Sequence, residues 1–136
     1  MLLTQLAVAR GARVITTVSR DDKEQLSRAA GASDVIRYEG FTDMAEDLPR
    51  AVRDLTDGTG VDVVYDGVGA ATFDGSLASL AVRGTLVLFG GASGQVPPID
   101  PQRLAPRWGG NSQRCPQQRS AGVRPTWWWS SWPAES

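Results

Sequence analysis

The sequence predicts an α/β fold built on a parallel sheet. Three times, a helical pattern ends at a glycine and leads directly into an apolar stretch, in ARGARVI, AAGASDVI and AVRGTLVLF. Strands that alternate with helices at this spacing are typical of parallel sheets, in which each helix connects two strands. The chain has 136 residues, which is enough for one such domain and too few for two.

The first two helices are predicted from periodicity and from their ends. Apolar residues repeat at helical spacing in residues 1–10, and Gly11 can end that helix in the left-handed conformation. Asp21 and Glu24, three residues apart, form a capping-box signature for a second helix, which is expected to end at Gly31.

Two more helices and four strands complete the predicted domain. Residues 42–56 have a helical pattern, and Pro49 inside it is expected to divide it into two pieces. A fourth helix repeats apolar residues at Phe73, Leu77 and Leu80. The predicted strands are residues 13–18, 35–38, 61–66 and 85–90.

Composition excludes several classes of protein. The chain has no histidine and one cysteine, Cys115, so neither an internal disulfide nor a zinc site is expected. No apolar run approaches the ~20 residues that span a bilayer, and no basic stretch precedes the apolar N-terminal residues. We therefore expect a cytoplasmic protein without a membrane partner, and the single cysteine fits a reducing compartment.

Charge and tryptophan are unevenly distributed along the chain. Residues 1–106 hold ten basic and fourteen acidic side chains, whereas residues 107–136 hold four arginines, one glutamate and all five tryptophans. We predict a folded segment over 1–106 and an irregular tail over 107–136. One hypothesis is that the tail is read in a shifted frame and that Met1 is an internal start. The alternative is a tail that binds single-stranded nucleic acid or a membrane interface. The arginines do not interleave with the tryptophans, so we expect no nucleic-acid partner.

Polar and basic residues follow the first two predicted strands. In an open parallel sheet, ligands bind at the carboxyl ends of the strands, where the strand order reverses. Ser19, Arg20 and Lys23 follow the strand at 13–18, and a hydroxyl with two cations suits the adenosine 2′-phosphate of a dinucleotide. The same residues can equally form a solvated helix start. Tyr38 ends the second strand, where it can stack on an adenine or cover the sheet edge.

Glycine-rich loops follow the other two predicted strands. Their candidate cofactor-binding residues are Gly67, Val68, Gly69, Phe89, Gly90 and Gly91. Glycines at such a point either satisfy turn geometry or let the backbone approach a ligand closely. Two such loops after strands expected to be neighbours predict one shared cleft.

The segments LLTQLAVARGARVITTVS, AAGASDVIRY and VDVVYDGVGAATFDGSLASLAVRGTLVLFGGASG together carry a resemblance to a known family. They resemble the cofactor-binding half of the NADPH:quinone oxidoreductases, the zinc-free, zeta-crystallin-like branch of the medium-chain dehydrogenase/reductases. The resemblance covers residues 1–106 and implies a Rossmann-type domain, the cofactor NADPH, and hydride transfer to a quinone or enone. Ser19, Lys23 and Tyr38 match positions at the 2′-phosphate end of NADPH. VYDGVG and FGGASG match the loops at its nicotinamide end, and no residue of this chain is assigned as catalytic.

The chain also departs from that family. The family's first strand, its glycine turn for the pyrophosphate and its substrate domain would all precede the residue that matches Met1. In the family's strand order, 3-2-1-4-5-6, the strands at 13–18 and 61–66 flank that first strand, so we expect an incomplete sheet in which they lack a shared partner. The family's homodimer contact, beyond IDPQRL, is also expected to be lost. Three interpretations stay open: a quinone reductase, a non-catalytic NADP-binding remnant or pseudogene product, and an enoyl reductase or alcohol dehydrogenase of the same superfamily.

Overall fold

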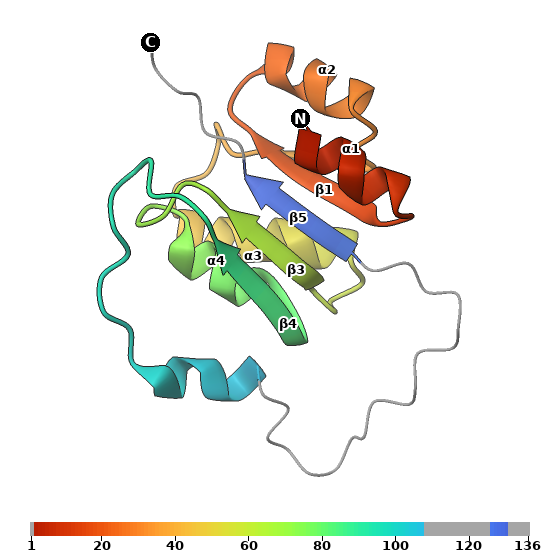
Figure 1. Cartoon of the computed structure of the whole chain (residues 1–136). Coiled ribbons are helices and arrows are strands. Elements are labelled where there is room, and N and C mark those ends of the chain that lie inside the picture. The colour runs from red at the N-terminus through yellow and green to blue at the C-terminus, as the bar shows by residue number, and fades with distance from the viewer. Residues whose placement is uncertain (1, 108–125, 131–136) are drawn as a thin grey trace.

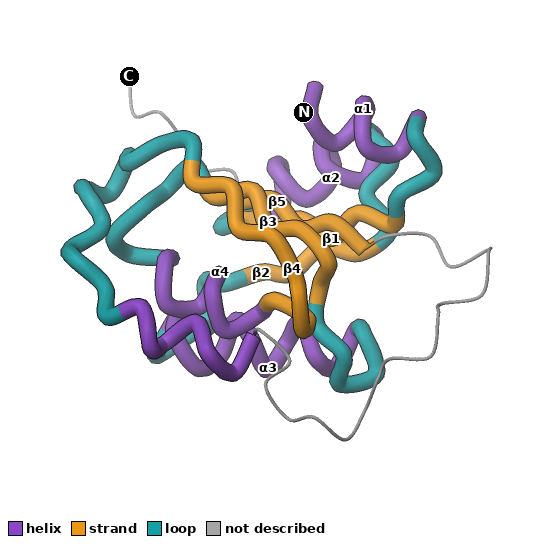
Figure 2. The backbone as a smooth tube through the Cα atoms, turned by 60° about the horizontal axis from the view of Figure 1, so that its bottom comes forward, coloured by secondary structure: helices purple, strands orange, loops and turns teal. Residues whose placement is uncertain are grey.

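The computed structural model describes residues 2–107 and 126–130. These residues form one five-stranded parallel sheet with the strand order β2-β1-β5-β3-β4. Helices α1 and α2 cover one face of the sheet, and α3 and α4 cover the other (Figures 1 and 2). The elements are α1 (Leu2–Ala9), β1 (Arg13–Val18), α2 (Asp21–Ala29), β2 (Asp34–Arg37), α3 (Met44–Leu55), β3 (Val61–Asp66), α4 (Phe73–Ser79), β4 (Leu80–Leu88), the 3₁₀ helix η1 (Pro101–Arg107) and β5 (Thr126–Ser130).

The centre of the sheet is occupied by β5. This strand pairs in parallel with β1 on one side and β3 on the other, so that Trp128 lies opposite both Ile15 and Val64. The expectation that β1 and β3 lack a shared partner is therefore wrong, and so is the expectation of irregular structure at residues 126–130. Consecutive aromatic residues favour extended backbone, and the main-chain groups of β1 and β3 need partners once they are buried. The other tail residues, 108–125 and 131–136, lie outside the described residues.

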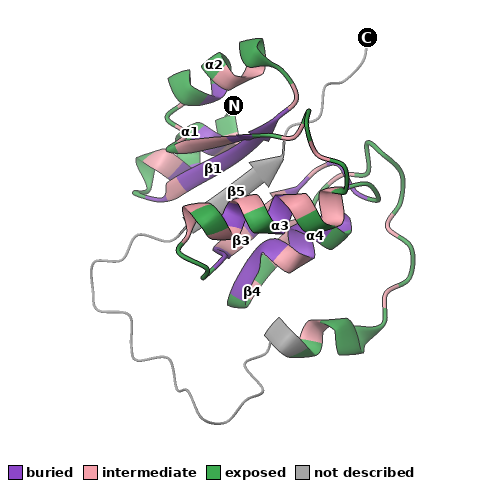
Figure 3. Ribbon diagram, turned by 180° about the vertical axis from the view of Figure 1, so that it is seen from behind, coloured by how far each residue is buried: buried purple, intermediate pink, exposed green. Residues whose placement is uncertain are grey.

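The main core lies between the sheet and the α3–α4 layer. Ile15, Val64 and Leu48 are fully buried there. On the other face, a smaller cluster joins Ala7 of α1 to Val14 of β1. Val14 and Ile15 pack into different layers because successive side chains of a strand point to opposite faces. The burial of β1 and β3 beneath the helices is visible in Figure 3.

The start of α2 differs from the capping-box prediction. Arg20 is the N-cap residue, in extended conformation, and no side chain caps this helix end. Asp21 instead forms an ion pair with Arg37 of β2 at 2.6 Å, and Glu24 binds Arg28 one turn later at 2.8 Å. Both acids are engaged by arginines, so neither acts as a cap. The predicted end of α1 is confirmed, because Gly11 has a φ of 80°.

Helix α3 is continuous through Pro49, contrary to the expected division. Its first turn is held firmly. Asp43 is the N-cap and accepts the N–H of Ala45 at 2.8 Å, while Asp47 accepts the N–H groups of Asp43 and Thr42 at 3.1 and 2.9 Å. These backbone donors, that of Asp43 first, hold the pKa of Asp47 below its usual 3.8. Pro49 is buried and its neighbour Leu48 packs in the main core, so tertiary packing compensates for the hydrogen bond that proline cannot donate.

The remaining boundaries shift by a few residues. The predicted strand at 85–90 begins earlier, at Leu80, and the pairing of β4 with β3 is irregular between Val61 and Val63. The strand expected at 35–38 is β2, which leaves Tyr38 just beyond its end. Among the residues that the structure describes, no helix has the length and apolar character required to traverse a bilayer.

Candidate functional site at the carboxyl edge of the sheet

The predicted site residues all lie at one edge of the sheet. Ser19 follows β1, Tyr38 follows β2, Gly67 follows β3 and Phe89 follows β4. Since every strand of the sheet is parallel to its neighbours, these four chain positions share the edge to which the arrows point in Figure 1. The strand order divides them into two groups. One group lies beside β1 and β2, the other beside β3 and β4, and β5 separates them.

The group at β1 and β2 combines cations with a hydroxyl and an aromatic ring. The N–H of Tyr38 donates to the carbonyl of Val18 at 3.1 Å, which holds Tyr38 against the end of β1. Arg20 forms an exposed ion pair with Asp22 at 3.2 Å. Lys23 has no ion pair within residues 2–107 and 126–130. Such cations can bind an anion, since exposed ion pairs contribute little and exchange readily.

Sequence reasoning missed one cation of this group. Arg37, the last residue of β2, binds Asp21 at 2.6 Å and Glu39 at 3.2 Å. It connects the start of α2 to the end of β2. Its place at the end of a strand, on the edge where ligands bind in parallel sheets, is the sequence signal that identifies it.

The group at β3 and β4 consists of two loops that are hydrogen-bonded to each other. We call residues 67–72 the β3 loop and residues 89–94 the β4 loop. Backbone bonds run across them from Phe89 N–H to Asp66 C=O (3.0 Å), from Ser93 N–H to Val68 C=O (2.8 Å) and from Ala70 N–H to Gly94 C=O (3.2 Å). The structure therefore brings the two glycine-rich loops together, while the cofactor cleft predicted from them stays a prediction.

Two glycines of these loops, Gly69 and Gly90, are required by the loops themselves. A Cβ at Gly67 would lie 2.8 Å from the ring of Phe89, and one at Gly90 would lie 2.6 Å from the carbonyl oxygen of Gly67. Gly69 has a φ of +91°, and its Cβ would lie 2.6 Å from the carbonyl oxygen of Gly94. Of the two interpretations open from sequence, turn geometry and loop packing account for Gly69 and Gly90 without a ligand. At Gly67 both interpretations stay open, because the nearby atoms belong to the exposed side chain of Phe89, which can move.

Asp66 is the second residue that sequence reasoning missed. Its carboxylate is fully buried, and it accepts hydrogen bonds from Val68 N–H (2.8 Å), Gly69 N–H (3.1 Å), Thr72 Oγ1 (2.8 Å) and Ser76 Oγ (2.6 Å). It thereby joins the end of β3, the β3 loop and the start of α4. An aspartate before a glycine, followed by two hydroxyl residues four apart at the start of the next helix, is a pattern that could have revealed it.

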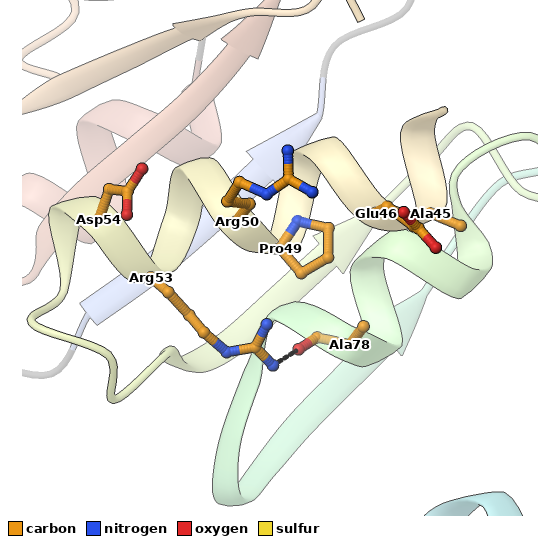
Figure 4. A pocket seen from close by; sticks show the side chains of 7 residues that line it. All are labelled: Ala45, Glu46, Pro49, Arg50, Arg53, Asp54 and Ala78. Carbon is orange, nitrogen blue, oxygen red and sulfur yellow. Dashed lines mark hydrogen bonds between the residues drawn. The ribbon is translucent and has the colours of Figure 1, made fainter. Parts of the chain in front are cut away.

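A surface depression of about 500 Å³ lies elsewhere, on the helical layer between α3 and α4 (Figure 4). Two of its lining residues are joined by a hydrogen bond from Arg53 Nη2 to the carbonyl of Ala78, at 2.9 Å. The charges that line it balance, with Glu46 and Asp54 against Arg50 and Arg53. It contains none of the predicted cofactor residues.

Together, the parallel sheet, its reversal of strand order at the centre and the loops at its carboxyl edge define a Rossmann-type α/β domain. Residues 1–111 match the family model described as zinc-binding dehydrogenase, so the chain belongs to this family. Among the described residues, no group of three or more histidine, cysteine, aspartate or glutamate side chains is arranged to hold a metal ion.

Curated relatives and solved structures agree with this assignment. A quinone oxidoreductase of Pseudomonas aeruginosa is 46% identical over 92 residues, which are 68% of this chain and 27% of that protein. A mycobacterial protein solved in complex with NADPH is 60% identical with a TM-score of 0.72, over 78% of this chain and 32% of that one. The quinone oxidoreductase of Escherichia coli, also solved with NADPH, is 39% identical with a TM-score of 0.68, over 76% and 30%.

These matches confirm the resemblance to the quinone oxidoreductases that the sequence carries. They also set its extent, because the chain spans only about 30% of the length of these relatives.

Proposed function

We propose that the carboxyl edge of the sheet binds NADPH and that the chain is the cofactor-binding part of a quinone oxidoreductase. The observation that carries this proposal is the gathering of two groups of residues at one edge, on either side of the sheet centre. It is supported by two similar structures, 60% and 39% identical, whose proteins were solved with NADPH.

The residues at β1 and β2 suit the adenosine end of NADPH. Ser19 supplies a hydroxyl, and Arg20 and Lys23 supply positive charge for the 2′-phosphate. The exposed pair between Arg20 and Asp22 can open at little cost. Tyr38, held against the end of β1, offers a ring on which the adenine can stack.

The loops at β3 and β4 suit the nicotinamide end. Phe89 is 57% exposed and lies against Gly67, so it offers an apolar surface beside the β4 loop. When bound, NADPH supplies a hydride to a quinone or enone substrate. The part of this chain is to hold and orient the ring and to limit the access of water, and no protein acid or base is assigned.

Two alternatives remain within the same superfamily. A 2-haloacrylate reductase of a Burkholderia species is 42% identical over 89 residues, which supports a reductase of another unsaturated substrate. A non-catalytic NADP-binding protein would bind NADPH without oxidising it. Quinone-dependent oxidation of NADPH by the purified chain separates that protein from a reductase.

Replacing Lys23 with alanine tests the adenosine end of the proposed site. We expect the affinity for NADPH to fall by about tenfold, because one charge-assisted bond to the 2′-phosphate is lost, while the affinity for NADH stays unchanged. Fluorescence titration of the full chain with each nucleotide measures both. Arg28→Ala is the matched control, since Arg28 lies on the same helix and is paired with Glu24 at 2.8 Å. An equal loss for NADH and NADPH, or no binding of either nucleotide by the unaltered chain, would refute the assignment.

A further inference from the structure

We propose that Asp66 and Ser93 are positioning residues for the nicotinamide end of the cofactor, because together they immobilise both main-chain groups of Val68. This inference rests on the proposed function. Neither residue belongs to the set predicted to touch NADPH. Their proposed effect acts through the β3 loop, whose conformation they fix before the cofactor arrives.

Asp66 holds the Val68 backbone from its N–H side. The carboxylate oxygen Oδ1 accepts the N–H of Val68 at 2.8 Å and that of Gly69 at 3.1 Å. Its other oxygen, Oδ2, accepts the hydroxyls of Thr72 and Ser76 at 2.8 and 2.6 Å. The carboxylate forms no ion pair within the described part of the chain, so these donors supply its neutralising contacts. A buried carboxylate that is satisfied in this way fixes the direction of every group that binds it.

Ser93 holds the Val68 backbone from its C=O side. The carbonyl oxygen of Val68 accepts the Ser93 N–H at 2.8 Å and the Ser93 hydroxyl at 2.8 Å. The same hydroxyl accepts the N–H of Ala71 at 2.9 Å, so this one side chain both donates a hydrogen bond to the β3 loop and accepts one from it. Because Ser93 belongs to the β4 loop, these bonds lock the two loops to each other.

The consequence for binding is a pre-formed nicotinamide end. A loop that is ordered before binding does not lose conformational freedom when the ligand arrives, so its rigidity contributes to affinity. The residues at the adenosine end lie beyond β5, after the ends of β1 and β2, and do not depend on this pair of loops. Loosening the Val68 backbone should therefore weaken only the nicotinamide half of the interaction.

Two ligands distinguish binding at the nicotinamide end from binding at the adenosine end in the full-length chain. NADPH engages both ends of the proposed site, whereas 2′,5′-ADP engages the adenosine end alone. For Ser93→Ala we expect the affinity for NADPH to fall about fivefold and the affinity for 2′,5′-ADP to stay the same, because the loss of one or two ordinary hydrogen bonds corresponds to a change of that size. Ser93→Thr keeps the hydroxyl and should restore NADPH binding. Ser33→Ala is the matched control, at an exposed serine just before β2, on the opposite edge of the sheet, and should change neither affinity.

Asp66→Asn completes the test, with a larger expected loss of NADPH affinity. The double variant should lose less than the product of the two single losses, since both side chains act on the same residue. If Asp66→Asn fails to fold, Ser93→Ala alone still decides. Unchanged NADPH affinity in Ser93→Ala, or an equal loss for 2′,5′-ADP, would overturn the inference while the proposed function stood. Failure of the unaltered chain to bind NADPH would instead refute the proposed function.

Discussion

Replacing Trp128 with proline is expected to abolish the folded sheet. Trp128 is the middle residue of β5 and lies opposite Ile15 of β1 and Val64 of β3, both fully buried. Proline cannot donate a main-chain hydrogen bond and is not tolerated in the interior of a central strand. We expect a loss of at least about 3 kcal/mol from a total free energy of unfolding of about 5–15 kcal/mol.

Urea unfolding followed by circular dichroism measures this effect. Trp128→Tyr is the control, because tyrosine keeps both the main-chain donor and a strong preference for strands. The tyrosine variant should unfold close to the unaltered chain, and the proline variant should show no cooperative transition. A proline variant with an unchanged urea midpoint would mean that β5 does not contribute to the sheet.

Replacing Gly75 with alanine is expected to destabilise the contact between α3 and α4. A Cβ at this position would lie 2.5 Å from the carbonyl oxygen of Met44 and 3.3 Å from Leu48 Cδ2. Alanine favours a helix over glycine by about 1 kcal/mol, so an unobstructed site would gain stability. Here the collision with backbone dominates, and we expect a net loss of about 1–3 kcal/mol.

The urea midpoint of Gly75→Ala, compared with that of Gly40→Ala, isolates this collision. Gly40 has open space where its Cβ would be and does not have a positive φ, so its replacement should leave the midpoint near that of the unaltered chain. A midpoint for Gly75→Ala that lies above that of the unaltered chain would contradict the packing of α4 on α3.

The sequence was most informative where the signal is local. The helices before Gly11 and Gly31, and the strands β1 and β3, were predicted within a residue or two, because periodicity and glycine ends are properties of short segments. Asp21 was misassigned as a cap because its partner, Arg37, is sixteen positions away and enters only when α2 packs beside β2. Pro49 was expected to divide a helix that its caps and buried face hold together.

The central strand and the organisation of the loops needed the tertiary structure. The segment TWWWS carries no signal that identifies β1 and β3 as its neighbours. Its strand conformation depends on pairing with the edges of those two strands, which only the tertiary structure shows. Gly67 and Gly69 stay predicted cofactor contacts, and the positive φ of Gly69 and its contact with Gly94 account for that glycine without a ligand. Asp66 and Ser93 were missed as contacts because a carboxylate or a hydroxyl shows its role only once its donors and acceptors are in place.

We propose that the two groups at the carboxyl edge form one NADPH site. Titration of the ¹⁵N-labelled full chain with NADPH, followed by amide NMR shifts, tests it most directly. We expect the amides of Ser19, Lys23 and Tyr38 to shift together with those of Gly67, Gly69 and Gly90, all with one midpoint. Shifts confined to the depression at Arg50 and Arg53, or no shift at any of these amides, would contradict it.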